Sequence, residues 1–347
     1  MLTVCVKLNL APTLIKSATY VQPLIRPAAH NNLIRSFVGN GRNSVRTYAN
    51  DARDSYSRAS RRRTLKEMAM EPTSGKPFHI GQGALAGGAA LGLGALCYYG
   101  LGLSSQTGAI DHSVLWPTYV RERIRATYMY FGGSLILTAG AAVAAFRSPT
   151  MMRLVGNNSF LSIAATLAAM IASGVLVQSI PYKEGFGAKQ LAWMLHTAVV
   201  GTVIAPICLI GGPLLVRAAW YTAGVVGGLS TVAVCAPSEK FLNIGGPLAI
   251  GFGVVLASSI ASAFLPPTTA LGAGLYSISM YGGLLLFSGF LLYDTQRIIR
   301  AAEVYPLNAP VPFDPVNASI SIYLDTINIF IRIAMILAGG GGGGKKK

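Results

Sequence analysis

The stretch SISIYLDTINIFIRIAMILA, residues 319–338, decides the fold class because it is an almost wholly apolar segment near the end of the chain. A helix that crosses the hydrocarbon core of a bilayer needs about 20 such residues. Two side chains in the stretch carry charge, Asp325 and Arg332. A charge inside a membrane is energetically costly and usually serves function. The stretch therefore predicts a membrane-spanning helix and marks both residues as candidates for a functional site.

The same apolar pattern recurs upstream, and the composition of the chain agrees with it. Of 347 residues, 52% are hydrophobic and 12% are charged, whereas a soluble domain has about 25% charged residues. We therefore predict an all-α, polytopic membrane helix bundle with eight transmembrane helices, one leading helix and a seven-helix core, and we exclude a soluble enzyme with a charged shell. The predicted spans are 83–103, 127–146, 159–180, 191–211, 217–236, 244–264, 271–293 and 319–338.

The net charge of +16 is concentrated outside these spans. Residues 1–48 hold several Lys, Arg and Ser residues and no acid, a composition typical of a mitochondrial transit peptide. A basic tail without a targeting role and a chloroplast address are the alternatives, and no nucleic-acid partner is expected. The predicted organisation is a transit peptide at 1–48, a basic matrix-facing segment at 49–82, a Gly-rich first helix at 83–103, a seven-helix core at 120–338 and a Gly/Lys tail at 339–347.

The distribution of basic residues between the loops predicts the orientation. Eight spans place both termini on one side of the membrane. That side then holds Arg147, Arg153, Arg217 and the three C-terminal lysines. Loops on the inner side of a membrane carry an excess of Lys and Arg. We therefore expect a multi-pass protein of the mitochondrial inner membrane, embedded in the lipid bilayer with both termini in the matrix.

Two aspartates on the last two spans form the predicted site. Asp294 follows the seventh span, and Asp325 lies six residues into the antiparallel eighth span, about 9 Å deep at 1.5 Å per residue. Both carboxylates therefore lie toward the same membrane face. Two carboxylates that share a site can share a proton, and their oxygens are ligands suited to Ca²⁺. The spacing predicts competition between Ca²⁺ and H⁺, with Ca²⁺ as a transported ion and without a resident cofactor.

Neighbouring polar residues leave alternatives open. Arg297, Arg332 and Asn328 are candidate partners of the aspartates. In the alternative, Asp294 is an ordinary interfacial residue and Asp325 pairs with Arg332, two turns away. His196, inside the fourth span, is either a polar link between helices or a weaker candidate for transport.

The motifs around the two aspartates carry a resemblance. Residues 293–296, Tyr-Asp-Thr-Gln, and residues 324–330, Leu-Asp-x-x-Asn-x-Phe, resemble the Bax-inhibitor family over roughly residues 120–338. The resemblance implies a seven-helix core with a central last helix and a pH-sensing aspartate pair that gates calcium. It also implies calcium–proton exchange at the inner membrane, roles in cristae organisation and apoptosis, and partners such as cytochrome c or inner-membrane proteases.

One departure from the family concerns an arginine. Some members have an Arg on the second core helix that holds the first aspartate, whereas 159–180 contains no charged residue. Arg297 and Arg332 are the candidates to replace it, unless the closed state is held in another way.

Three functions compete on these features. The first is a calcium/proton exchanger or pH-gated calcium leak that uses Asp294 and Asp325. The second is a non-transporting scaffold that maintains cristae and restrains cytochrome c release, which the Gly-rich first span favours. The third, an intramembrane aspartyl protease, is disfavoured because residues 321–324, Ser-Ile-Tyr-Leu, stand where that class has Gly-x-Gly before its second aspartate. We therefore expect that the protein is not an enzyme.

Overall fold

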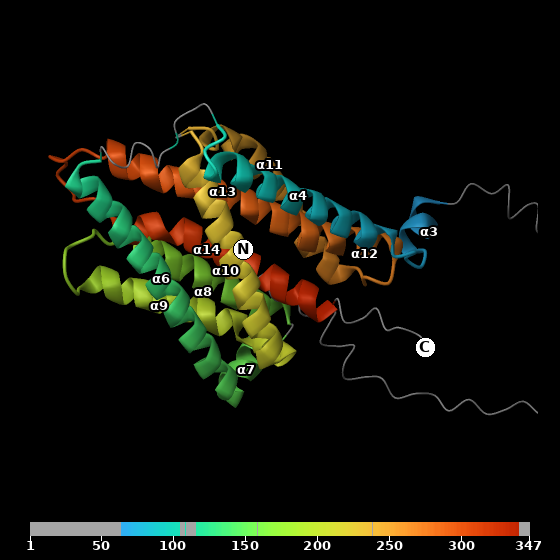
Figure 1. Ribbon diagram of the computed structural model, residues 1–347. Helices are drawn as coiled ribbons and strands as arrows, with labels where there is room; N and C mark the ends of the chain where they lie inside the picture. Colours follow the sequence, from blue (N-terminus) through green and yellow to red (C-terminus); the bar gives the residue numbers. More distant parts are fainter. Residues whose placement is uncertain (1–63, 105–107, 109–115, 158, 238, 340–347) are drawn as a thin grey trace, which may run out of the picture.

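The computed structural model describes residues 64–104, 108, 116–157, 159–237 and 239–339, and this part of the chain forms a helix bundle (Figure 1). Eight of the described helices are long and apolar enough to cross a membrane, which confirms the predicted all-α bundle. The predicted transit peptide and nearly all of the Gly/Lys tail lie outside the described residues.

The bundle is built from the helices that the structure describes. In chain order they are α3 (Leu65–Met70), α4 (Lys76–Gly100), α6 (Thr118–Arg147), α7 (Pro149–Gly156), α8 (Phe160–Ser179), α9 (Ala188–Ile204), η1 (Ala205–Ile210), α10 (Gly212–Cys235), η2 (Leu242–Ile244), α11 (Gly245–Phe264), α12 (Ala270–Ser277), η3 (Ile278–Gly282), α13 (Gly283–Val304) and α14 (Pro315–Gly339).

The first long helix begins earlier than the hydropathy predicts. Gly75, with φ of 75°, turns the chain into α4, and a proline in the first turn suits a helix start. The segment predicted as one basic arm, 49–82, is therefore divided in its described part between α3 and the first turns of α4. The Thr73 N–H donates to Thr268 O, and the Ala270 N–H donates to Glu71 O. These bonds attach the segment to the connection between α11 and α12.

The last helix is the centre of the bundle. α14, drawn in red in Figure 1, packs against α6, α10 and α13, and most of its residues are buried. A helix that is apolar nearly all round is stable only when neighbours or lipid surround it. By contrast, α4 lies at the periphery and buries only Gly81. The charges on α14 are therefore held in the protein interior, away from lipid.

Two spans are interrupted. α9 ends at Ile204 and continues as the 3₁₀ helix η1, which contains Pro206, as expected for a residue without a backbone donor. The seventh span changes from α12 to the π-helical turn η3 and then to α13. π-helical turns are rare and often lie at functional sites. α13 runs on to Val304, beyond the predicted end at 293, so Asp294 lies inside a helix.

Candidate functional site: a buried carboxylate pair

The two predicted aspartates meet inside the bundle. Asp294 comes from α13 and Asp325 from the antiparallel α14, and their side chains lie within hydrogen-bonding contact of each other. Both residues are buried, with exposed fractions of 5% and 6%. The helix register thus does what the sequence spacing predicts: it brings two carboxyl groups from consecutive spans to one place.

The surroundings of the two carboxyl groups differ. Arg297 lies one turn along α13, with Nη1 3.7 Å from Asp294 Oδ1, and the Ser321 side chain also bonds to Asp294. Asp325 Oδ2, in contrast, has no hydrogen-bond partner among the described residues. A buried polar atom without a partner is energetically unfavourable. The pair is therefore asymmetric: the carboxyl group on α13 has side-chain partners, whereas one oxygen of the carboxyl group on α14 has none among the described residues.

A cavity of about 490 Å³ adjoins the pair. Asp294 and Asp325 line it together with His196 and Asn328, and the rest of its wall is mostly apolar. A second cavity of about 400 Å³ adjoins the first and is lined in part by Arg297 and polar side chains. The residues shared by the two cavities are Gln178, Ile320, Ser321 and Leu324. The carboxylate pair therefore lies next to two neighbouring cavities.

His196 lines the same cavity but is not part of a metal cluster. Its Nδ1 lies 2.9 Å from Ser173 Oγ, and its Nε2 has no partner among the described residues. Within the same part of the chain, no three His, Cys, Asp or Glu side chains lie close enough to hold a metal ion. A cation at the aspartates would therefore need oxygen ligands from hydroxyl groups, amides or water.

Arg332 is fully buried and is held beside the cavity. Its Nη1 donates to Asn328 Oδ1 at 2.9 Å and to Asn328 O at 3.1 Å, and its Nε donates to Ser279 O at 3.2 Å. The guanidinium carbon lies 4.5 Å from the centre of the Phe287 ring. These contacts, rather than the pairing with Asp325 weighed above, hold the guanidinium. Asn328 connects the guanidinium to the cavity, because its side chain bonds to the guanidinium and also lines the cavity.

Room for the Arg332 guanidinium depends on a glycine in the seventh span. Gly283, the first residue of α13, lies against the guanidinium so closely that a side-chain carbon there would overlap Nε and approach Cζ to 2.9 Å. The carbonyl that Nε reaches belongs to Ser279 in the π-helical turn η3. The interruption of the span and the missing side chain together accommodate the buried cation.

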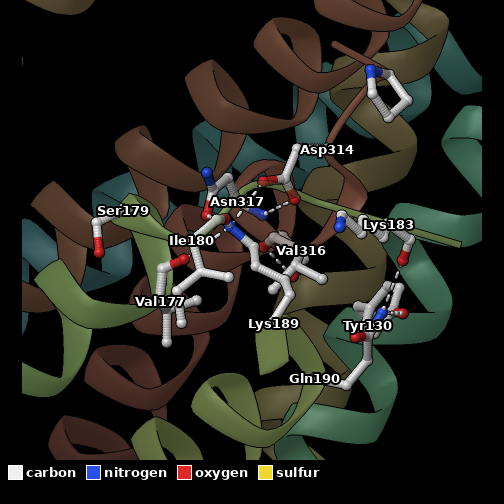
Figure 2. Close-up of polar contacts among 12 residues, drawn as sticks. Tyr130, Val177, Ser179, Ile180, Lys183, Lys189, Gln190, Asp314, Val316 and Asn317 are labelled. Carbon is white, nitrogen blue, oxygen red and sulfur yellow. Dashed lines mark hydrogen bonds and ion pairs between the residues drawn. The ribbon is translucent and has the colours of Figure 1, made fainter. Parts of the chain in front are cut away.

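A second buried cation, Lys189 near the start of α9, is not marked by any feature of the sequence. Its side chain is 1% exposed, and its Nζ lies 2.7 Å from Asp314 Oδ2 (Figure 2). Its other ligands include two backbone carbonyls. Backbone acceptors leave no sequence signature, so hydropathy and motif spacing did not reveal this cluster.

Comparisons with known proteins agree with this geometry. Residues 120–342 match the family model described as "Inhibitor of apoptosis-promoting Bax1". The chain is 56% identical to "Growth hormone-inducible transmembrane protein" of Rattus norvegicus over 296 residues, which cover 84% of this chain and 86% of that protein.

More distant relatives match a smaller part of the chain. "Bax inhibitor 1" of Oryza sativa subsp. japonica is 27% identical over 50% of this chain and 66% of its own length. "Bax inhibitor 1" of Bos taurus is 27% identical over 53% of this chain and 76% of its own length. The family match covers α6 to α14, the helices that surround the carboxylate pair. The chain therefore belongs to the Bax-inhibitor family of multi-pass membrane proteins.

Proposed function

We propose that this protein moves Ca²⁺ across the mitochondrial inner membrane, in exchange for protons or as a pH-gated leak, through the Asp294–Asp325 pair. The observation that carries the proposal is the contact of two buried carboxyl groups beside a cavity. Two ionised carboxylates in contact repel each other, so a proton or a cation between them is needed to hold them together. Protons and Ca²⁺ then compete for one place.

The ligands at the pair suit passage of Ca²⁺ better than storage. Ca²⁺ takes six to eight oxygen ligands, whereas the pair offers at most four carboxylate oxygens. The Ser321 hydroxyl and the Asn328 amide lie at the same cavity and, with water, complete the shell in our proposal. Incomplete ligation by the protein means modest affinity, and an ion that is bound modestly can leave again. This is the behaviour that a transport site requires.

The proposed address rests on the sequence. The acid-free N-terminal composition supports import into mitochondria, and Arg147, Arg153 and Arg217 all lie at the end of the bundle where α6 ends and α10 begins. This supports a matrix location for that end and for both termini. In this proposal the ions are Ca²⁺ and H⁺, the protein carries no cofactor, and it transports rather than catalyses. Effects on cristae and apoptosis, and contact with cytochrome c or inner-membrane proteases, are part of the same proposal.

A second candidate function is the inner-membrane scaffold, and one observation favours it. α4 lies at the edge of the bundle, and Gly83, Gly87 and Gly94 have open space where a side chain would be. Glycines on a membrane helix allow a second helix to approach closely. A protein whose role is to hold a partner through α4 does not need the carboxylates.

Flux measurements on purified protein in liposomes test the proposal. We expect Ca²⁺ entry that changes with external pH, and at least a tenfold loss of flux in Asp325→Asn and in Asp294→Asn. The control is Arg300→Gln, an exposed change on the same helix. Gln296→Glu would not serve, because the Gln296 amide donates to backbone carbonyls. Unchanged flux in both Asp variants contradicts the assignment of the site, and rescue of cristae shape in cells by the double Asp variant supports the scaffold.

A further inference from the structure

The cluster around Lys189 is a complete cation site that the protein fills with its own side chain. Figure 2 shows the Lys189 ammonium group among oxygens of α8 and α14. Its Nζ donates to Val177 O at 2.7 Å, Ile180 O at 3.0 Å and Asn317 Oδ1 at 2.8 Å, and it pairs with Asp314 Oδ2 at 2.7 Å. An ammonium group has three protons to donate. Every proton of this buried group therefore has an acceptor.

The oxygens come from the ends of two helices. Val177 and Ile180 belong to the last turn and the C-cap of α8, where carbonyls lack partners within the helix and the helix dipole is negative. Asp314 precedes α14 and accepts from the Asn317 N–H at 2.9 Å through Oδ1, while its Oδ2 meets Lys189. One carboxylate thus caps α14 and holds the lysine. The ammonium group joins the end of α8 to the start of α14.

One member of the cluster forms part of the wall of the second cavity. Asn317 bonds to Lys189 and also lines the second cavity. That cavity shares Gln178, at the end of α8, and Ser321, on α14, with the cavity of the carboxylate pair. The two helices that Lys189 joins are therefore two of the three helices that border the second cavity, the third being α13.

We propose that Lys189 is a clamp that holds the end of α8 against the start of α14 and so narrows this end of the space beside the carboxylate pair. Without the ammonium group, one carboxylate, one amide oxygen and two carbonyls would face each other across a buried space. Their negative and partly negative oxygens repel one another, and each has lost the donor that Lys189 supplied, so water enters and the end of α8 moves away from α14. Lys189 acts here as a positioning residue for the proposed calcium transport, on which its role in ion flux rests.

Thiol labelling tests the clamp without any ion transport. Ala318 lines the second cavity only, so Ala318→Cys reports access to it in a protein whose four native cysteines are changed to Ser. We measure its reaction with a membrane-impermeant thiol reagent in lipid nanodiscs, which expose both membrane faces. The test variant is Lys189→Met, which keeps the length of the side chain and removes the charge. The control is Lys183→Met, which removes an exposed charge from the loop that precedes α9.

We expect Lys189→Met to label at least fivefold faster than the Lys183→Met control, which should label at the unmodified rate. An unchanged rate in monodisperse Lys189→Met protein overturns the proposal. If that variant does not fold, Asn317→Ala removes a single ligand, and an unchanged rate in this milder variant overturns the proposal equally.

Flux through the same variants separates the two proposals. Faster labelling with faster Ca²⁺ flux supports both of them. If Lys189→Met labels faster but neither the variants nor the unmodified protein move Ca²⁺, the result supports the clamp and contradicts the proposed transport. Calcium flux with unchanged labelling contradicts the clamp and supports the proposed transport.

Discussion

The first half of α14 carries two buried charged sites that differ in how far the protein satisfies them. At its start, the Lys189 ammonium group has an acceptor for each proton and a carboxylate beside it. Farther along, Asp325 meets another acid, and its Oδ2 has no partner among the described residues. We call a buried charged site saturated when its hydrogen-bonding groups all have partners. A saturated site holds a structure together, whereas an unsaturated one leaves a place for a proton or a cation. The comparison therefore favours a structural role for the first site and supports the proposed ion binding at the second.

The largest effect on stability is expected at the saturated site. Lys189→Met leaves a buried carboxylate and three neutral acceptors without their donor, and loss of one partner of a buried ion pair costs about 3 kcal/mol or more. Because the Asp314 side chain is 20% exposed, we expect the lower end of that range. Thermal unfolding in detergent measures it, with Lys183→Met as the control. Equal melting temperatures for the two variants would show that the cluster is not structural.

The buried Arg332 gives a second, smaller test of a saturated charge. Gly283→Ala places a methyl group on the guanidinium and forces it away from Asn328 and Ser279, which we expect to destabilise the protein by about 1–3 kcal/mol. The neighbouring Gly282→Ala is the matched control, since its nearest atom is Ile278 Cγ2 at 3.7 Å, an ordinary contact. A loss of stability in the control as large as in the test variant would point to helix distortion instead.

These sites differ also in how far the sequence predicted them. Eight spans and the meeting of Asp294 with Asp325 followed from hydropathy and from the antiparallel course of consecutive helices, which are properties of local sequence. The central position of α14 did not follow from such properties and was implied only by the family resemblance. The start of α4 at Lys76 was missed because Gly75 and a first-turn proline, not hydropathy, set it.

The saturated sites were the part that the sequence did not reveal. Lys189 is held mainly by carbonyls of α8, and Arg332 depends on a π-helical turn and on the absent side chain of Gly283. Neither arrangement has a motif, since it depends on which helix ends come together in space. An aspartate within an apolar span can be recognised in the sequence, whereas the backbone carbonyls that hold a buried lysine or arginine cannot.

The unsaturated site should respond to neutralisation in the opposite way. Asp325→Asn keeps the side-chain volume and gives a buried amide that donates to Asp294, so no proton or cation is needed to hold the two side chains together. We expect the free energy of unfolding to stay within about 1 kcal/mol of the original, or to rise, while Ca²⁺ flux is lost. Unfolding and flux are measured on one preparation. Loss of stability as large as in Lys189→Met would show that the carboxylate pair, too, is mainly structural.

The smallest effect is expected at Arg297, which, in the part of the chain that the structure describes, is the cation paired with Asp294. It lies 3.7 Å from Asp294, but its side chain is 63% exposed, and water and salt screen an exposed charge. Arg297→Gln should therefore change Ca²⁺ flux by less than about threefold, and the change should shrink as ionic strength rises. Arg300→Gln, one turn farther from the pair and 50% exposed, is the control. A tenfold change that persists at high salt would mean that Arg297 binds Asp294 far more tightly in the working protein, and would make it the residue that holds the pair closed.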